Sequence, residues 1–148
     1  MILSGSALPE ELRAIRDHRP AELVDVYPTL LGIAGIDVPE FLPGENLLSS
    51  SVREANFCGL HEREGEAAFM WRTREHKLIL RFPRKEAADK YTSEDIIGGE
   101  FYDLLEDPRE WNDVYGTPDV MALQTEMTGA LMKHLGKLGR RSPNDISL

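Results

Sequence analysis

The stretch ELVDVYPTLLGIAGIDVPEFLP, residues 22–43, carries the densest local structural signals in the chain. We expect an extended run to end at Val24 and a short helix to follow it. Asp25 is expected to be the N-cap, because its carboxylate can accept hydrogen bonds from the free N–H groups of the first turn. Pro28 then falls in that turn, where no backbone donor is needed. Gly35 is expected to end the helix. Asp25 therefore has a structural role in this interpretation.

The composition limits the classes of function that are open to the chain. Its 148 residues are enough for one domain with a hydrophobic core. The net charge of −9 argues against nucleic-acid and anionic membrane partners, which need a basic surface. No apolar run approaches the roughly 20 residues that span a bilayer. The first residues lack the features of a signal peptide, so the chain as it stands is expected to be cytoplasmic.

Alternating apolar residues predict four strands, at residues 54–60, 66–73, 77–82 and 100–105. The second and third are close enough to form a hairpin. The single cysteine, Cys58, excludes an internal disulfide, and its mid-strand position predicts a buried, unreactive thiol. Residues 83–99 are polar and show no helical or strand period, so we expect a loop there.

The end of the chain predicts one long helix. Thr117 is expected to be its N-cap, with Pro118 at its first position. Its apolar stripe recurs at steps of three and four residues and consists of Val120, Leu123, Met127, Ala130, Leu131, His134, Leu135 and Leu138.

The predicted fold class is α+β: a small antiparallel sheet of about four strands packed against a long C-terminal helix and preceded by a strand–short-helix segment. We expect a linking segment at residues 1–48, the sheet and helix at 49–141, and a tail at 142–148.

The local chemistry predicts no self-sufficient active site. No serine lies in a G-x-S-x-G motif. The four histidines, His18, His61, His76 and His134, form no short-spaced metal-binding pair. Asp103, Glu106 and Asp107 could bind a cation, but turn and cap chemistry explains them better. We therefore assign no catalytic and no metal-binding residue.

Four segments nevertheless match a family pattern in order: VDVYPTLL with AGI and VP within residues 24–39, GENLL at 44–48, WRTREHKL at 71–78 and EFYDLLEDPREWN at 100–112. Together they resemble the C-terminal part of the sulfatase family, within the alkaline phosphatase-like superfamily. Residues 2–5 resemble the strand that shortly precedes the first segment. The resemblance covers roughly residues 20–138.

The resemblance implies a C-terminal subdomain of a sulfuric ester hydrolase. In that family the catalytic machinery lies upstream: a formylglycine made in a C/S-x-P-x-R motif, and a divalent metal, expected to be calcium. Cys58 is followed by Gly-Leu-His-Glu, so no catalytic residue carries over and we expect no cofactor in this chain. The chain alone is expected to be inactive, and whether it should be called an enzyme is left open.

By position in the family, the candidates for the rim of a substrate pocket are Arg72, Arg74 and His76 on the hairpin and His61 before it. Arginine at such a rim can pair with anionic groups. The implied partner is a catalytic sulfatase domain, in cis or in trans, or a second copy bound through an exposed apolar patch. Two alternatives stay open: a stand-alone, non-enzymatic binding or structural module, and a small enzyme that uses its acids or histidines.

Overall fold

The computed structural model describes residues 8, 10, 18–50, 53–61, 65–87 and 90–138. The chain divides into two compact units, Met1–Glu54 and Ala55–Leu148. The expected strand at residues 2–5 and the expected tail at 142–148 lie outside the described residues. The division into residues 1–48, 49–141 and 142–148 stays a prediction.

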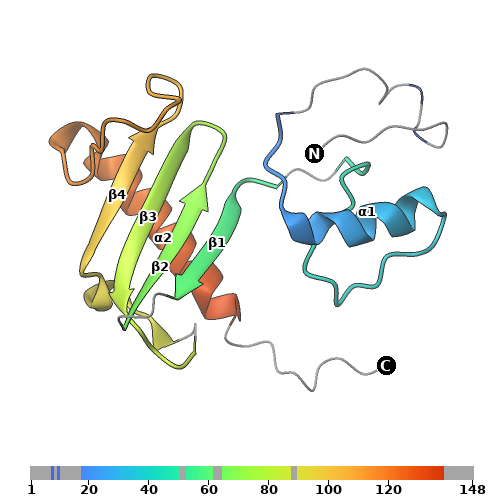
Figure 1. The fold of residues 1–148 in the computed structure, drawn as a ribbon, viewed down its shortest axis with the longest axis horizontal. Helices are drawn as coiled ribbons and strands as arrows, with labels where there is room; N and C mark the ends of the chain where they lie inside the picture. The colour runs from blue at the N-terminus through green and yellow to red at the C-terminus, as the bar shows by residue number, and fades with distance from the viewer. Residues whose placement is uncertain are drawn as a thin grey trace. The chain divides into compact units, whose positions relative to one another are not determined.

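The second unit contains one antiparallel sheet in which each strand pairs with the next one along the chain (Figure 1). Its strands are β1 (Asn56–His61), β2 (Glu66–Arg72), β3 (His76–Pro83) and β4 (Gly98–Asp103). All four predicted strands are present, with bounds within two residues of those expected. The α+β prediction is confirmed.

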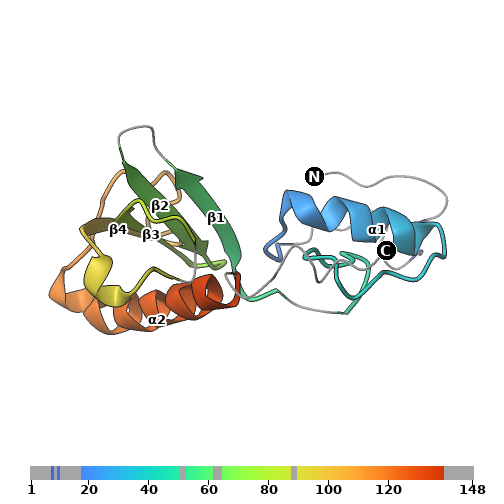
Figure 2. The ribbon, with the colours of Figure 1, turned by 90° about the horizontal axis from the view of Figure 1, so that it is seen from below.

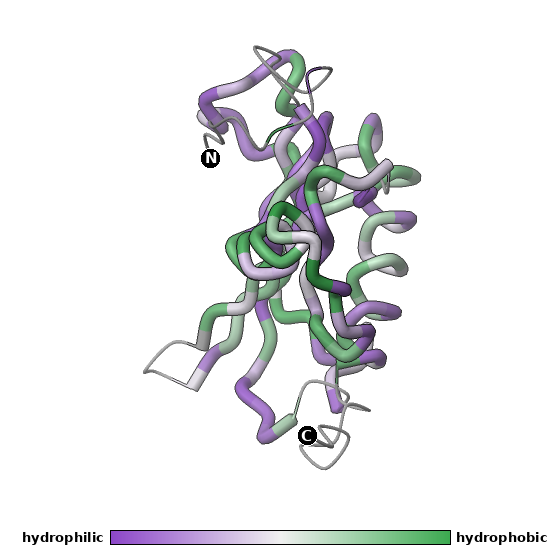
Figure 3. Tube along the Cα trace, turned by 90° about the vertical axis from the view of Figure 1, so that its right-hand side faces the viewer, coloured by the Kyte–Doolittle hydropathy of each residue, from purple (hydrophilic) through white to green (hydrophobic). Residues whose placement is uncertain are grey.

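One long helix, α2 (Met121–Leu138), covers one face of this sheet (Figures 1 and 2). It follows a 3-10 turn that begins at Pro118, as predicted. Hydrophilic and hydrophobic residues alternate along α2, as the colouring of Figure 3 shows. The inward residues of sheet and helix form the core, which contains Ala67, Phe69, Leu78, Leu80, Phe82, Phe101, Met127, Leu131 and Leu135. These are the alternating positions and the helix stripe that the sequence predicts.

Tyr91 joins this core from the segment that was expected to be a polar loop. It is buried, and its ring centroid lies 5.0 Å from that of Phe69 and 5.1 Å from that of Phe82. Its hydroxyl accepts a hydrogen bond from the Lys85 N–H at 2.9 Å, so the polar end of the ring has a partner. Lys85 also pairs with Asp95 at 2.5 Å. This contact is the main reason why the pKa of the Asp95 carboxyl is lowered to about 2.

The prediction that Cys58 is buried is wrong, because its side chain is exposed. Phe57 packs against the core, with its ring 6.0 Å from that of Phe69 and 4.6 Å from that of His134. Neighbouring side chains of a strand point to opposite faces. Cys58 therefore lies on the face of the sheet that α2 does not cover.

The two edges of the sheet differ. Along β4, Val114 donates its N–H to the Phe101 carbonyl at 2.9 Å, and the Asp113 carboxylate accepts the Phe101 N–H at 2.9 Å. The segment after β4 thus satisfies part of that edge. Among the described residues, β1 pairs only with β2.

The first unit is built around α1 (Val26–Ile33), which continues from a 3-10 turn at Leu23–Asp25. The expected strand end at Val24 is therefore wrong. Asp25 is the N-cap position of α1, as predicted, but its carboxylate makes no cap bond to the turn that follows. Glu22 caps the preceding 3-10 turn in a reciprocal capping box with Asp25, so the helical conformation starts three residues earlier than predicted. Gly35 ends the helix as predicted, with a φ of 68°.

Replacing Leu131 by alanine tests the core. Leu131 is fully buried, so Leu131→Ala removes apolar contact and leaves a cavity. The free energy of unfolding of the second unit should fall by about 3 kcal/mol in urea denaturation. Met121→Ala, on the exposed start of the same helix, should cost less than about 1 kcal/mol. Equal losses for the two variants would contradict this packing.

Candidate functional site

The four predicted rim residues do not come together in one place. Arg72, Arg74 and His76 belong to the β2–β3 hairpin, whereas His61 pairs with Ala67 at the other end of β2. Arg72 lies five residues farther along β2 than Ala67, which corresponds to roughly 17 Å. His61 therefore lies at the opposite end of the sheet from the hairpin.

The hairpin residues also face different ways. His76 lies on the helix-covered side with Leu78, and its ring centroid is 5.8 Å from that of Phe101. Arg72 lies on the open face, opposite Lys77 in the register. Arg72 and Arg74 are both exposed, and neither guanidinium has a hydrogen bond or ion pair among the described residues. The hairpin thus presents two cations to the surface and directs one histidine inward.

The open face also carries a second polar group, which the sequence did not predict. Lys77 forms an ion pair with Glu110 and lies over the Tyr102 ring, 5.2 Å from its centroid. The Tyr102 hydroxyl donates to the Glu100 carboxylate at 2.8 Å. This hydrogen bond is the largest cause that raises the pKa of Tyr102 to about 12. The alternation of β3 and β4 could have placed Lys77, Tyr102 and Glu100 on one face, but the loop partner Glu110 has no such periodic signal.

The acids after β4 organise a turn. The Asp103 carboxylate accepts from the N–H groups of Leu105 and Glu106, at 2.9 and 3.2 Å. The Asp107 carboxylate accepts from the Asn112 N–H at 2.7 Å. Turn chemistry therefore accounts for Asp103 and Asp107.

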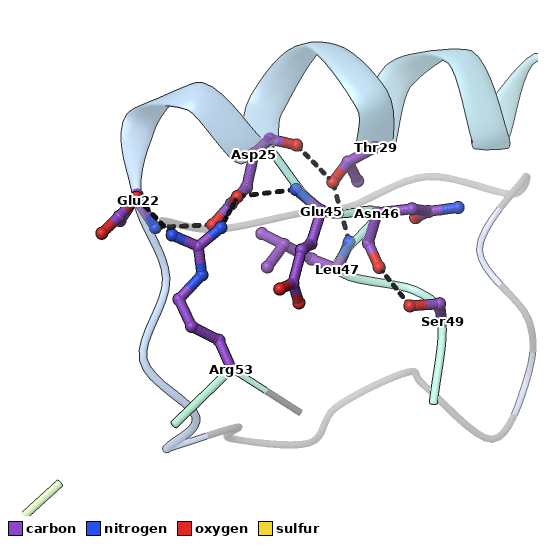
Figure 4. Close-up of polar contacts among 8 residues, drawn as sticks. All are labelled: Glu22, Asp25, Thr29, Glu45, Asn46, Leu47, Ser49 and Arg53. Atoms are coloured by element: carbon purple, nitrogen blue, oxygen red, sulfur yellow. Dashed lines mark hydrogen bonds and ion pairs between the residues drawn. The ribbon is translucent and has the colours of Figure 1, made fainter. Parts of the chain in front are cut away.

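Asp25 is the most buried charged group among the described residues (Figure 4). Its carboxylate accepts from the backbone N–H of Glu22 at 2.7 Å and from that of Glu45 at 2.8 Å, and it pairs with Arg53. Arg53 also pairs with Glu22. The loop that follows α1 is thereby tied to the beginning of the helix at two points.

Thr29 extends this network by one turn. Its hydroxyl donates to the Asp25 carbonyl at 2.6 Å and accepts from the Leu47 N–H at 3.0 Å (Figure 4). Arg19 donates to the carbonyls of Leu47 and Ser49, at 3.0 and 3.1 Å. Asp25 and Thr29 are buried and their oxygens are engaged, so the network holds the fold together and leaves neither group free for chemistry.

The described residues do not fit the divalent metal that the family resemblance implies. No group of three His, Cys, Asp or Glu side chains among them could hold a metal ion. No described helix is long and apolar enough to cross a bilayer.

The Asp25 network predicts a local loss of stability in Asp25→Asn. The substitution breaks a buried ion pair and leaves the charge of Arg53 paired with Glu22 alone. The free energy of unfolding of the first unit should fall by about 3 kcal/mol. Hydrogen exchange at the Glu45 amide should accelerate roughly 100-fold. The exposed Asp37→Asn is the matched control and should leave that rate unchanged. An unchanged rate in Asp25→Asn would show that the pair does not hold the loop.

The Tyr102–Glu100 contact predicts a change in titration. In Glu100→Gln the carboxylate that favours the protonated phenol is lost, so the pKa of Tyr102 should fall from about 12 towards its ordinary value. The neutral phenol is stabilised in the folded state. The contact's contribution to stability is therefore present below the ordinary tyrosine pKa and lost as the pH rises through about 12. An NMR titration of the ring carbon next to the hydroxyl measures both values, and identical curves would contradict the contact.

Comparison with known proteins agrees on one family. No family model matches the chain. The uncharacterized sulfatase YidJ of Escherichia coli (strain K12) is 27% identical over 127 residues, covering 80% of this chain and 23% of that protein. An N-acetylglucosamine-6-O-sulfatase of Bacteroides thetaiotaomicron is 26% identical over 116 residues, covering 70% and 19%. The solved structure of a 2-O GAG sulfatase matches with a TM-score of 0.63 at 21% identity, covering 78% and 25%.

The chain thus spans about a quarter or less of the proteins that it matches. This share agrees with the C-terminal position that the order of the sequence motifs predicts. The α+β fold of the second unit is shared with the solved sulfatase. In sequence the chain is thus similar to part of several sulfatases, and its fold is similar to part of a solved sulfatase structure.

Proposed function

We propose that this chain is the C-terminal part of a sulfuric ester hydrolase whose chemistry is done by a catalytic domain bound to it, in cis or in trans. The observation that carries the proposal is partial coverage: the chain matches most of its own length but about a quarter or less of its relatives. The formylglycine and the divalent metal would then be held by the catalytic domain.

An exposed apolar helix face supports a large partner. Leu23, Tyr27 and Leu30 follow one another at four and three residues, so they lie on one side of the turn that leads into α1 and of α1 itself. Their exposed fractions are 88%, 58% and 54%. A face of this kind is typical of an interaction surface. We assign it to the catalytic domain; pairing with a second copy is the competing outcome.

The hairpin would contribute to the substrate rim. Arg72 and Arg74 are exposed cations without a partner among the described residues, and a planar guanidinium suits an oxyanion with several acceptor oxygens. His76 packs against Phe101, and His61 lies at the far end of the sheet, so both are weaker candidates. The name of the N-acetylglucosamine-6-O-sulfatase relative supports a sulfated sugar as the substrate class.

A reconstitution assay tests the proposal. The purified chain with calcium should not turn over an aryl sulfate or an aryl phosphate. Co-expression with the sulfatase segment that carries C/S-x-P-x-R, encoded upstream or in a neighbouring gene, should give aryl sulfate turnover. Leu23→Asp with Leu30→Asp should weaken the complex at least roughly tenfold, since neither position would then bury an apolar side chain in the interface with the catalytic domain.

Ile97→Asp is the control for each single substitution, because it places one carboxylate on an exposed apolar residue of the second unit. Turnover by the chain alone that disappears in a His61 or His76 variant would overturn the proposal in favour of a small enzyme. If no C/S-x-P-x-R segment is encoded nearby, the result would favour a stand-alone binding module.

A further inference from the structure

The loop after β4 holds an unusually exposed tryptophan. Trp111 keeps 74% of its surface accessible, although indoles of this size are normally packed. The Arg109 guanidinium lies over its ring, 5.1 Å from the centroid. One face of the indole is thus backed by a cation, and most of the remaining ring surface is open.

The loop is built to hold this position. Glu110, next to Trp111, has a φ of 57°, a left-handed conformation that is uncommon for a residue other than glycine. Its side chain pairs with Lys77, and its N–H donates to the Asp107 carbonyl at 3.1 Å. The Asp107 carboxylate then caps the Asn112 N–H on the other side of Trp111. Strained backbone that the surroundings fix in this way is a recurrent feature of binding sites.

The same loop lies beside the hairpin that carries Arg72 and Arg74. Leu104 donates its N–H to the Glu75 carbonyl at 2.7 Å, and Lys77 of β3 holds Glu110. In Figure 1 the loop leaves β4 at the same end of the sheet as the β2–β3 turn. An open aromatic face and exposed arginines therefore lie at one end of the second unit.

We propose that Trp111 and Arg109 form a saccharide subsite, in which the uncovered face of the indole stacks on the apolar face of a pyranose ring and the guanidinium pairs with a sulfate group that extends past the edge of the indole from that ring or its neighbour. The inference rests on the proposed function, which supplies the sulfated sugar as ligand class. The surroundings favour a sugar over a protein partner, because the residues beside the indole are polar or charged, and Leu105 is the only other exposed large apolar residue of the described loop.

NMR of the isolated chain tests this subsite without any catalytic domain. The chain has two tryptophans, Trp71 and Trp111, so its two indole N–H signals can be followed separately. On titration with N-acetylglucosamine 6-sulfate oligosaccharides, the Trp111 signal should shift and the Trp71 signal should not. Neutral N-acetylglucosamine oligosaccharides should bind at least tenfold more weakly, because Arg109 then lacks its anion.

Variants separate stacking from charge. Trp111→Ala should weaken binding at least tenfold, Trp111→Phe should keep most of it, and Arg109→Gln should remove the preference for the sulfated sugar. Leu105→Ala, on the same loop, is the matched control and should bind like the wild type.

Unchanged affinity in Trp111→Ala would overturn the inference. It would also fail if Trp111→Ala weakened only the complex with the catalytic domain, since Trp111 would then be a protein contact. In that case the reconstituted aryl sulfate turnover would still stand, so the two proposals fail independently.

Discussion

The second unit depends on the apolar contact between α2 and the inward face of the sheet. Leu131 and Leu135 are fully buried together with Leu78, Leu80 and Phe82, and α2 is the α-helix of this unit that covers that face. Because side chains alternate along a strand, fixing these residues inward also fixes their neighbours outward. The positions of Arg72, Lys77 and Tyr102 on the open face therefore follow from the helix contact, although all three point away from the helix. In this unit, the residues that pack into the core therefore determine which residues of each strand face outward.

The sequence predicts a feature well where the feature is periodic or where nearby residues mark its beginning or end. The strands, the helix stripe and the helix stop at Gly35 could all be predicted, because each depends on residues that are close in the chain. Asp25 shows where this approach fails. Its carboxylate was assigned to the following turn, but it turns back to Glu22 and reaches across the chain to Arg53. A contact between residues 28 positions apart has no local signature.

The candidate sites show the same difference between features with a local signal in the sequence and features that depend on distant residues. The hairpin arginines could be found through family resemblance, yet the resemblance placed His61 beside them, and only the pairing of β1 with β2 shows that it lies at the other end. Cys58 was assigned to the interior because its segment is apolar, when the alternation with Phe57 already pointed to the open face. Trp111 was not predicted as a site residue, because a single exposed aromatic residue produces no periodic pattern in the sequence. The surroundings of His61 and Trp111 depend on which distant segments of the chain lie together, and the sequence alone does not show this.

The exposed thiol has a practical consequence. Cys58 is the chain's only cysteine, and it lies on the sheet face that α2 leaves open. A maleimide dye would therefore attach at one chemically defined position without entering the core. Its emission would report on whatever approaches that face, and the native sequence already provides this attachment point for single-site fluorescence labelling.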